Sequence, residues 1–542
     1  MTDKEYGDVL KDYRKSSNRH ILIAETDMLS SNVQQVFATS NRIRKAGNEL
    51  VALMRKRYHQ LMRTKRYRNL LKLYGKAKKG TSERADYGRQ LQEMQKLYDV
   101  TWDFCRKSMI HIAKKYNVNS IFGLTKAEDI WHGLEKCLYS DGKTIHFAKF
   151  GDYPAIRAKQ VNRGIPISVK GGALRFKIKK ISFGIIIKDK FQQDEINAVF
   201  NYIQNQEKED MYAVKYFLET DECVSTYRPC YATLVPKKIR GRYRVFLHLC
   251  IEGKPMPKFD KYGNPRHSYG KGQIGADIGT QTVAYTAKSS VGLKNLAERG
   301  KRSIKSSERM ERIYLRKMDR SKRATNPQNY NPDGTIKKGR KVWRYSKNYK
   351  KTKYLYANLC RKNAENRRLA NNEDANYLRS LGDVFVTEPK NAKMLMKRAK
   401  QTTVNEKTGK INKKKRFGKS IRNRCPGYFQ VKVQQLFEST GGAYIEVPNN
   451  YRASQYDHTT DDYIKKSLSQ RMFNLTDGTE VQRDWYSSFL LYCYDFATQN
   501  IDKEKCNNEF GRFLDKEKAL ISWIKANKIK VLNSGIKFDK AA

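Results

Sequence analysis

Long apolar runs and paired cysteines are both missing from this sequence. No uninterrupted apolar stretch approaches the roughly 18 residues of a membrane-spanning helix, so we expect none. Residues 1–20 contain no apolar core of the kind found in secretory signals, which predicts a cytoplasmic protein. The nine cysteines are odd in number and include no Cys-x-x-Cys pair, so we expect free thiols in a reducing interior.

Acidic residues are also scarce relative to basic ones. The 542 residues include 55 Asp and Glu against 110 Lys and Arg, which gives a formal net charge of +55. A well-solvated surface or an enzyme for neutral substrates does not need such a one-sided balance, whereas a polyanion partner does. The 34 Tyr and 22 Phe add aromatic faces on which bases of single strands or RNA can stack. Composition therefore predicts a nucleic-acid-binding protein.

Periodicity changes along the chain and indicates several domains of the α+β and α/β classes. Apolar residues recur at helical spacing over 27–140, whereas 141–265 alternates and is rich in β-branched residues. Three Pro and three Gly in 254–272 indicate a linker, and strands alternate with helices from 273 onward. We expect this division: 1–26 and 141–265, a β-rich, barrel-like domain; 27–140, a helical region; 266–447, an α/β domain with a basic insertion at 289–380; 448–480, an insertion without cysteine; 481–542, the end of the α/β domain.

Three carboxylates lie at the ends of predicted elements in the α/β region. Asp277 ends the strand "QIGAD", Glu388 ends the strand "DVFVTE", and Asp484 opens the helix "RDWYSSFLL". Two strand ends and a helix start can meet at one rim of a sheet. Clustered carboxylates repel one another unless divalent cations neutralise them, and oxygen-only sites favour Mg²⁺ or Mn²⁺. Two such ions can activate water and stabilise the leaving 3′ oxygen of a phosphodiester.

Each acid also has an ordinary structural explanation. Asp277 could be a turn former, Glu388 an exposed edge residue, and Asp484 a helix N-cap. The ordered combination of all three in a chain that attracts polyanions favours the metal site.

Four segments around these acids resemble a known family. "ADIGTQTVAY", "VFVTEPKNAKMLMKRAK", "RFGKSIRNRCPGYFQVKVQQLFESTGGAYIEVPNNYRASQYDH" and "VQRDWYSSFLL" are similar, in order and spacing, to the split motifs of the RuvC-like nuclease domain of TnpB proteins. TnpB is the transposon-encoded relative of type V CRISPR effectors. The resemblance covers about 273–500. It implies a RuvC-like (RNase H-type) nuclease domain, with 27–140 as a helical recognition lobe and the β-rich part as a wedge domain.

The resemblance also implies an activity and a set of partners. Members are RNA-guided DNA endonucleases, in which a guide RNA pairs with double-stranded target DNA and the protein reads a short flanking motif. Asp277, Glu388 and Asp484 would then be the ligands of two Mg²⁺ or Mn²⁺ ions. Arg471 is a candidate contact to the substrate phosphate, or else an ordinary surface arginine. A transposon function and antiviral defence both remain open, as does the oligomeric state.

The sequence departs from the family at the expected zinc finger. TnpB usually carries two Cys-x-x-Cys pairs between the second and third acids, but no cysteine occurs here from 426 to 492. His458 with Asp457, Asp461 and Asp462 makes a poor zinc set. We therefore expect no zinc and a small core instead, unless Cys425 or Cys493 supplies a thiol to His458 and Asp457. The expected core residues are Tyr451, Tyr456, Tyr463, Leu468, Met472, Phe473 and Leu475.

Other functions remain as alternatives. A guide-dependent DNA-binding repressor without cleavage would be favoured by loss of an acid, but all three are present. An acidic-triad transposase fits the motif frames less well, and no helix-turn-helix is evident. A structure-specific resolvase would not need the large basic N-terminal half.

Overall fold

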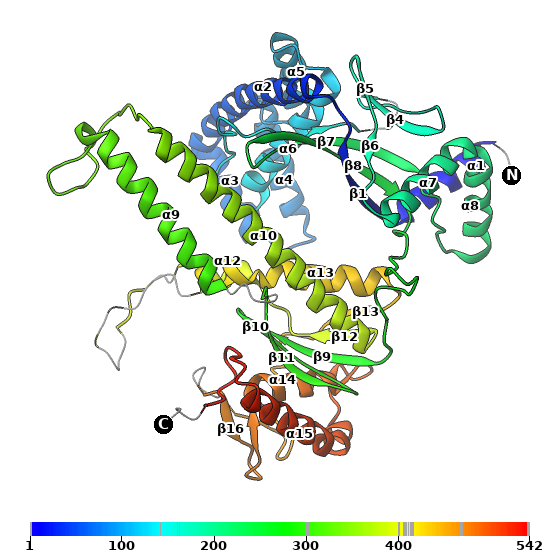
Figure 1. The fold of residues 1–542 in the computed structure, drawn as a ribbon, viewed down its shortest axis with the longest axis vertical. Helices are drawn as coiled ribbons and strands as arrows, with labels where there is room; N and C mark the ends of the chain where they lie inside the picture. The colour runs from blue at the N-terminus through cyan, green and yellow to red at the C-terminus, as the bar shows by residue number, and fades with distance from the viewer. Residues whose placement is uncertain are drawn as a thin grey trace. The chain divides into compact units, whose positions relative to one another are not determined.

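The structure is a computed structural model that divides into two compact units, Met1–Phe259 and Asp260–Ala542 (Figure 1). The residues that it describes are 3–140, 142–159, 161, 163–298, 304–398, 401–404, 409, 411, 417–464 and 470–538. Among these, no helix is both long and apolar enough to cross a membrane.

The helical part of the first unit is organised around its longest helix, α2. Buried residues such as Val36, Ile43, Leu50 and Leu61 recur along one side of α2, which packs against α5 and α6. Helices α4, α5 and α6 begin at side-chain caps; for example, the Thr101 side chain accepts a hydrogen bond from the backbone N–H of Phe104 at the start of α5. The bounds are α2 (Ser30–Arg63), α3 (Lys65–Lys76), α4 (Ser82–Leu97), α5 (Trp102–Lys115) and α6 (Ser120–Tyr139).

The strands of the first unit form open sheets. One sheet has the order β2-β7-β8-β1-β6, and a second has the order β3-β4-β5. The expected barrel is not found among the described residues, because β2 and β6 are short edge strands on opposite sides of the larger sheet. The bounds are β1 (Arg19–Thr26), β2 (Ile156–Arg157), β3 (Ile167–Lys170), β4 (Ala173–Ile178), β5 (Ile181–Phe183), β6 (Ile185–Ile186), β7 (Pro229–Ile239) and β8 (Arg242–Glu252).

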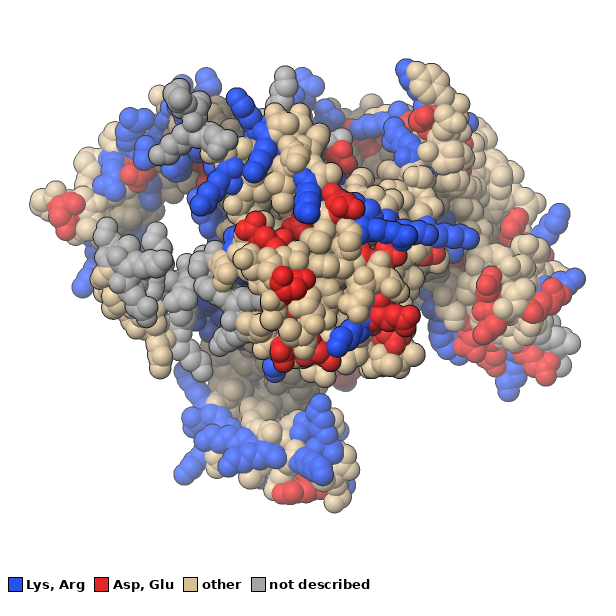
Figure 2. Space-filling view, turned by 90° about the horizontal axis from the view of Figure 1, so that it is seen from below, with Lys and Arg blue, Asp and Glu red and all other residues tan. Residues whose placement is uncertain are grey.

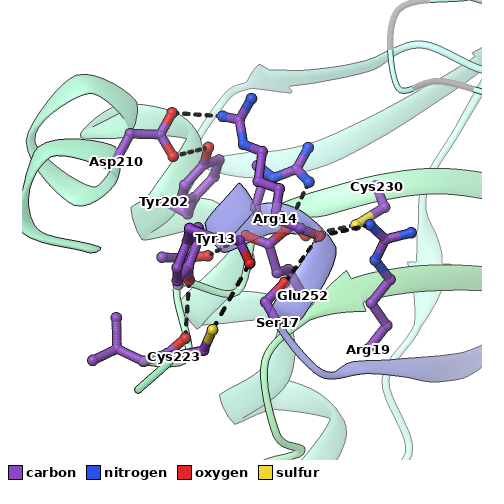
Figure 3. A network of polar contacts seen from close by, with 12 residues as sticks. Tyr13, Arg14, Ser17, Arg19, Tyr202, Asp210, Cys223, Cys230 and Glu252 are labelled. Carbon is purple, nitrogen blue, oxygen red and sulfur yellow. Dashed lines mark hydrogen bonds and ion pairs between the residues drawn. The ribbon is translucent and has the colours of Figure 1, made fainter. Parts of the chain in front are cut away.

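Three further helices, α1 (Asp3–Ser16), α7 (Lys190–Gln204) and α8 (Gln206–Thr220), are joined by a polar network (Figure 3). Asp210 on α8 accepts from Arg14 at 2.9 Å and from the Tyr202 hydroxyl at 3.0 Å. Tyr13 is fully buried and donates to the carbonyl oxygen of Val224. Because Asp210 is itself buried, Arg14 is needed to compensate its charge and Tyr202 to satisfy its other oxygen. The network therefore fixes α1 and α8 to the same end of this unit.

The second unit contains a five-stranded mixed sheet of order β11-β10-β9-β12-β13. Strands β9, β10 and β11 are antiparallel neighbours, whereas β12 runs parallel to both β9 and β13. The bounds are β9 (Gln273–Ile278), β10 (Thr282–Ala287), β11 (Val291–Asn295), β12 (Val384–Thr387) and β13 (Ala443–Glu446).

Helices cover both faces of this sheet (Figure 1). On one face, Ile274 and Phe385 pack with residues of α10 (Lys347–Leu381) and α13 (Pro426–Ser439). On the other, α14 (Arg483–Tyr492) lies directly on β9. Gly275 permits this approach, because a side chain there would collide with backbone atoms of Ser488 and Tyr492.

The remaining elements of the second unit surround this layered core. Helix α9 packs along α10, and α15 packs against β11 and α14. The bounds are α9 (Ile304–Thr325), a 3-10 turn (Pro327–Asn329), α11 (Ala392–Leu395), α12 (Gly418–Arg424), β14 (Tyr456–Asp457), β15 (Asp462–Tyr463), β16 (Met472–Asn474), β17 (Glu480–Gln482), β18 (Tyr494–Asp495), β19 (Asn500–Ile501) and α15 (Lys503–Ala526).

Candidate functional site

Asp277 and Glu388 lie at the same edge of the second unit's sheet. Strands β9 and β12 are parallel neighbours in which Gly275 pairs with Val386, so their carboxyl ends point the same way. Side chains alternate between the faces of a strand. Asp277 therefore shares the face of Gly275, and Glu388, just beyond β12, follows the face of Val386. Gly275 lies against the backbone of α14, and Val386 is buried in the core that α14 forms. Both acids are therefore directed to the α14 side of the sheet.

Asp484 lies in the first turn of α14, on that same side of the sheet. The N-cap of α14 is Gln482, whose side chain accepts from the backbone N–H of Trp485 at 2.8 Å. Capping therefore does not explain Asp484. Its carboxylate is 12% exposed and accepts from Arg483 at 2.9 and 3.1 Å and from Arg471 at 3.2 Å.

The pKa shifts place Asp277 within electrostatic reach of both Glu388 and Asp484. Burial raises the pKa of Glu388, and the negative charge of Asp277 raises it further. Burial and the charge of Asp277 likewise raise the pKa of Asp484, against the opposing effect of Arg483 and Arg471. Asp277 therefore repels both of the other acids, as a shared anionic site requires.

A lysine that the sequence reasoning missed completes this site. Lys390 follows Glu388 by two residues, and its ammonium contacts the Asp277 carboxylate. Burial alone would lower its pKa, but the charges of Asp277 and Glu388 outweigh burial and raise it. Arg483, beside Asp484, was also missed. Each of these two residues lies within two positions of a candidate acid, which is the signal that could have identified it. That signal is weak here, because lysine and arginine are common throughout the chain.

Arg471 is positioned by its backbone as well as its side chain. Its carbonyl oxygen accepts from the N–H of Arg483, and its guanidinium donates to Asp484 and, at 3.4 Å, to Asn533. Burial lowers its pKa, against the raising effect of Asp484. Arg471 is thus a half-buried partner of the third acid rather than an isolated surface arginine.

The donor chemistry of the three acids suits a hard divalent cation. Their carboxylate oxygens are the ligands that Mg²⁺ and Mn²⁺ prefer. Among the described residues, however, no three His, Cys, Asp or Glu side chains stand close enough together to hold one ion. Instead, three basic residues, Lys390, Arg471 and Arg483, pair with Asp277 and Asp484. Metal binding would require some of these pairs to open.

The cysteine-free insertion packs against α14 through aromatic residues. Tyr451, Tyr456, Phe473 and Leu475 are buried in one core with Trp485, whereas Tyr463 is exposed and Leu468 lies outside the described residues. Met472 is half-buried, so four of the seven expected residues form this core. The zinc content of the protein remains a prediction.

The candidate zinc ligands of the insertion contact protein atoms. Asp457 accepts four hydrogen bonds, two from Thr459 and two from Thr476. The His458 ring is buried and lies 2.8 Å from the Tyr486 hydroxyl, and burial lowers its pKa. Cys493 is fully buried, and burial raises the pKa of its thiol. These contacts give each of the three residues a structural role.

Comparison with known proteins gives only distant matches. No family model and no curated protein matches the sequence. A solved Cas12f1–sgRNA–target DNA complex matches at 10% identity over 88% of this chain and 99% of that one, with a TM-score of 0.23. Two Cas12i1 R-loop complexes, before and after target DNA cleavage, match at 9% and 8% identity with TM-scores of 0.26.

The Cas12i1 matches cover a larger share of this chain than of the Cas12i1 chains. They cover 84% and 94% of this chain but 56% and 65% of the Cas12i1 chains, so this chain spans less than two thirds of their length. At these identities and TM-scores, the likeness carries no argument about function.

Proposed function

We propose that this chain is an RNA-guided DNA endonuclease that cleaves phosphodiester bonds at a RuvC-like site with divalent metal ions. The observation that carries the proposal is the position of the three acids. Asp277 and Glu388 follow adjacent parallel strands, and Asp484 opens the helix that lies on β9. Functional groups of α/β sheets gather at the carboxyl ends of such strands.

Two further observations support the same function. The sheet is mixed and has helices on both faces, as the RNase H-type domain implied by the motifs would have. The net charge of +55 suits a protein that holds more than one nucleic-acid strand. On the face drawn in Figure 2, Lys and Arg side chains project in several dense groups, with Asp and Glu gathered in separate ones.

The chain's own residues would act by holding charge. Asp277, Glu388 and Asp484 would be the ligands of the metal ions. When bound, Mg²⁺ supplies an activated water and stabilises the leaving oxygen. Lys390, Arg471 and Arg483 neutralise the acids of the free protein, and a substrate phosphate offers the two arginines an alternative anion with matching bidentate geometry.

One observation favours the guide-dependent repressor as a second candidate. Asp277 and Asp484 are already paired with basic side chains, and no three-ligand set is assembled among the described residues. A chain that kept these pairs closed would bind DNA without cutting it. The two candidates differ in the result of a single cleavage assay.

The proposal is tested with the RNA that copurifies with the protein. We expect a defined structured RNA that ends in a variable segment, and site-specific cleavage of DNA matching that segment in Mg²⁺. Guided binding without cleavage would establish the repressor instead. Site-specific cleavage by protein freed of RNA would contradict guidance altogether.

A further inference from the structure

An extended segment of the first unit lies along one stripe of α2. We call residues 146–154 the α2 strap. The Asn48 side chain donates to the carbonyl oxygen of Ala148 at 2.9 Å and accepts from its N–H at 2.8 Å. Further along, Ser40 donates to the carbonyl oxygen of Pro154, and the Phe37 ring packs edge-on against Tyr153. The strap therefore runs antiparallel to α2 and is fixed to it at both ends.

Two phenylalanines of the α2 strap are exposed on either side of the Asn48 contact. Phe150 is 92% exposed and Phe147 is 47% exposed. A single exposed apolar side chain is ordinary, but two aromatic rings close together on a fixed backbone among basic side chains are typical of a nucleic-acid-binding surface. The bidentate contact of Asn48 with Ala148 supplies that fixed backbone between them.

Each ring also lies against an arginine of α2. The Arg44 guanidinium is 5.7 Å from the Phe150 ring centre, and that of Arg55 is 5.2 Å from the Phe147 ring centre. Arg44 is itself oriented by two hydrogen bonds to Asn41, at 3.0 and 2.9 Å. The arginines support the rings, while much of each ring remains open to solvent.

The surroundings of the rings are positively charged. Lys45 and Lys56 on α2 and Lys149 on the α2 strap are exposed. The nearby Glu49 is engaged by Lys115 and Tyr116, and Asp152 accepts from the backbone N–H of Lys149. Aromatic rings among lysines are typical of single-strand binding sites, whereas lysine is depleted in the cores of protein–protein interfaces.

We propose that the α2 strap binds a single-stranded segment of RNA, whose bases stack on Phe147 and Phe150 while Lys45, Lys56 and Lys149 bind its phosphates. This inference rests on the proposed function, which makes nucleic acid the partner. The strand is single because the bases of a duplex cover their own faces. Phe147 lies against Arg55 and Phe150 against Arg44, which are eleven residues apart on α2, so each ring is placed to stack on its own base.

The choice of RNA follows from the proposed function. The target of a guided endonuclease is duplex DNA, whose bases are already paired and stacked, whereas the guide RNA is single-stranded until it pairs. A site that stacks unpaired bases therefore fits the guide.

The experiment measures binding of full-length, RNA-free protein to a fluorescein-labelled 20-nucleotide poly(A) RNA in EDTA. Phe147→Ala and Phe150→Ala should each weaken binding about 10-fold, and the double variant about 100-fold, because each removes one base-stacking contact. Phe150→Leu should lose as much as Phe150→Ala, since it keeps apolar bulk but not the ring. Tyr262→Ala is the matched control: Tyr262 is 75% exposed beside Lys261 but lies outside the strap.

Salt titration separates stacking from charge. The phenylalanine variants should keep the wild-type slope of log affinity against log salt, because they remove no phosphate contact. Lys149→Gln should lower that slope by about 0.7, the value for one contact with a single strand. A 20-base-pair RNA duplex should bind all the phenylalanine variants as it binds the wild type.

Three results would overturn the proposal: unchanged poly(A) affinity in a double variant with wild-type melting temperature, an equal loss for the duplex, or a larger loss for the poly(dA) strand than for the RNA. The last result would assign the strap to DNA. Because the assay uses no metal and no cleavage, it can fail while the three acids remain catalytic. It can equally succeed if the protein proves to be a repressor.

Discussion

Lys390 should compete with a divalent cation for the acidic site, so replacing it should strengthen metal binding. Its ammonium contacts Asp277 and is attracted by Glu388. Two unit charges about 4 Å apart interact by roughly 4 kcal/mol at an effective dielectric constant of about 20. Because the Lys390 side chain is 30% exposed, solvent screening reduces this to about 1–2 kcal/mol. Lys390→Met should therefore tighten Mn²⁺ binding by about 5- to 30-fold.

The assay is a Mn²⁺ titration of the protein without nucleic acid, followed by electron paramagnetic resonance of the free ion. Removing the ammonium also leaves the acids to repel one another, so the variant should melt at a lower temperature without metal and recover more on adding Mn²⁺. Lys397→Met is the control, since Lys397 is an exposed lysine of the same segment. Unchanged or weaker Mn²⁺ binding in Lys390→Met, or the same gain in the control, would refute the reasoning.

Three further predictions concern the second unit. Burial raises the pKa of Glu517 to about 7, above its ordinary 4.5. The native state therefore holds this proton more tightly than the unfolded state, so the free energy of unfolding falls as pH rises from about 4.5 to 7. Urea unfolding at pH 5 and pH 8 should show this fall, worth about 2–3 kcal/mol, in the wild type but not in Glu517→Gln. Gly275→Ala should destabilise the protein by about 1–3 kcal/mol, because its methyl group would meet the backbone of α14; an unchanged melting temperature would contradict that packing. Elemental analysis should find well under one zinc per chain; stoichiometric zinc that is lost in His458→Ala would show that the insertion is a metal site.

Local patterns predicted the elements that carry the acids. The strands ending near Asp277 and Glu388 are short and are followed by Gly or Pro, and α14 has an apolar face, so each is specified within a few residues. The position of Asp484 after the Gln482 cap was not predictable, because an acid before an apolar run is usually the cap itself.

Features that depend on distant residues were missed. The pairing of Lys390 with Asp277 joins residues that are 113 positions apart, and the sequence contains too many lysines for any one of them to stand out. Helix α1 and the polar network around Asp210 depend on contacts across the first unit, and α1 lies in a segment that was expected to belong to a β-rich domain. The open sheet in place of a barrel reflects strand pairing at the sheet edges, which periodicity does not encode.

The three-acid site is most directly tested in a plasmid-cleavage assay. The protein with its copurified RNA is given a matching plasmid in Mg²⁺ and is compared with Asp277→Ala, Glu388→Gln and Asp484→Ala. Each variant should lose cleavage by orders of magnitude while its guided binding to the same DNA stays close to wild type, because a metal ligand acts on the chemical step. Cleavage near the wild-type rate by any one of the three would show that its carboxylate is structural and would contradict the three-acid site.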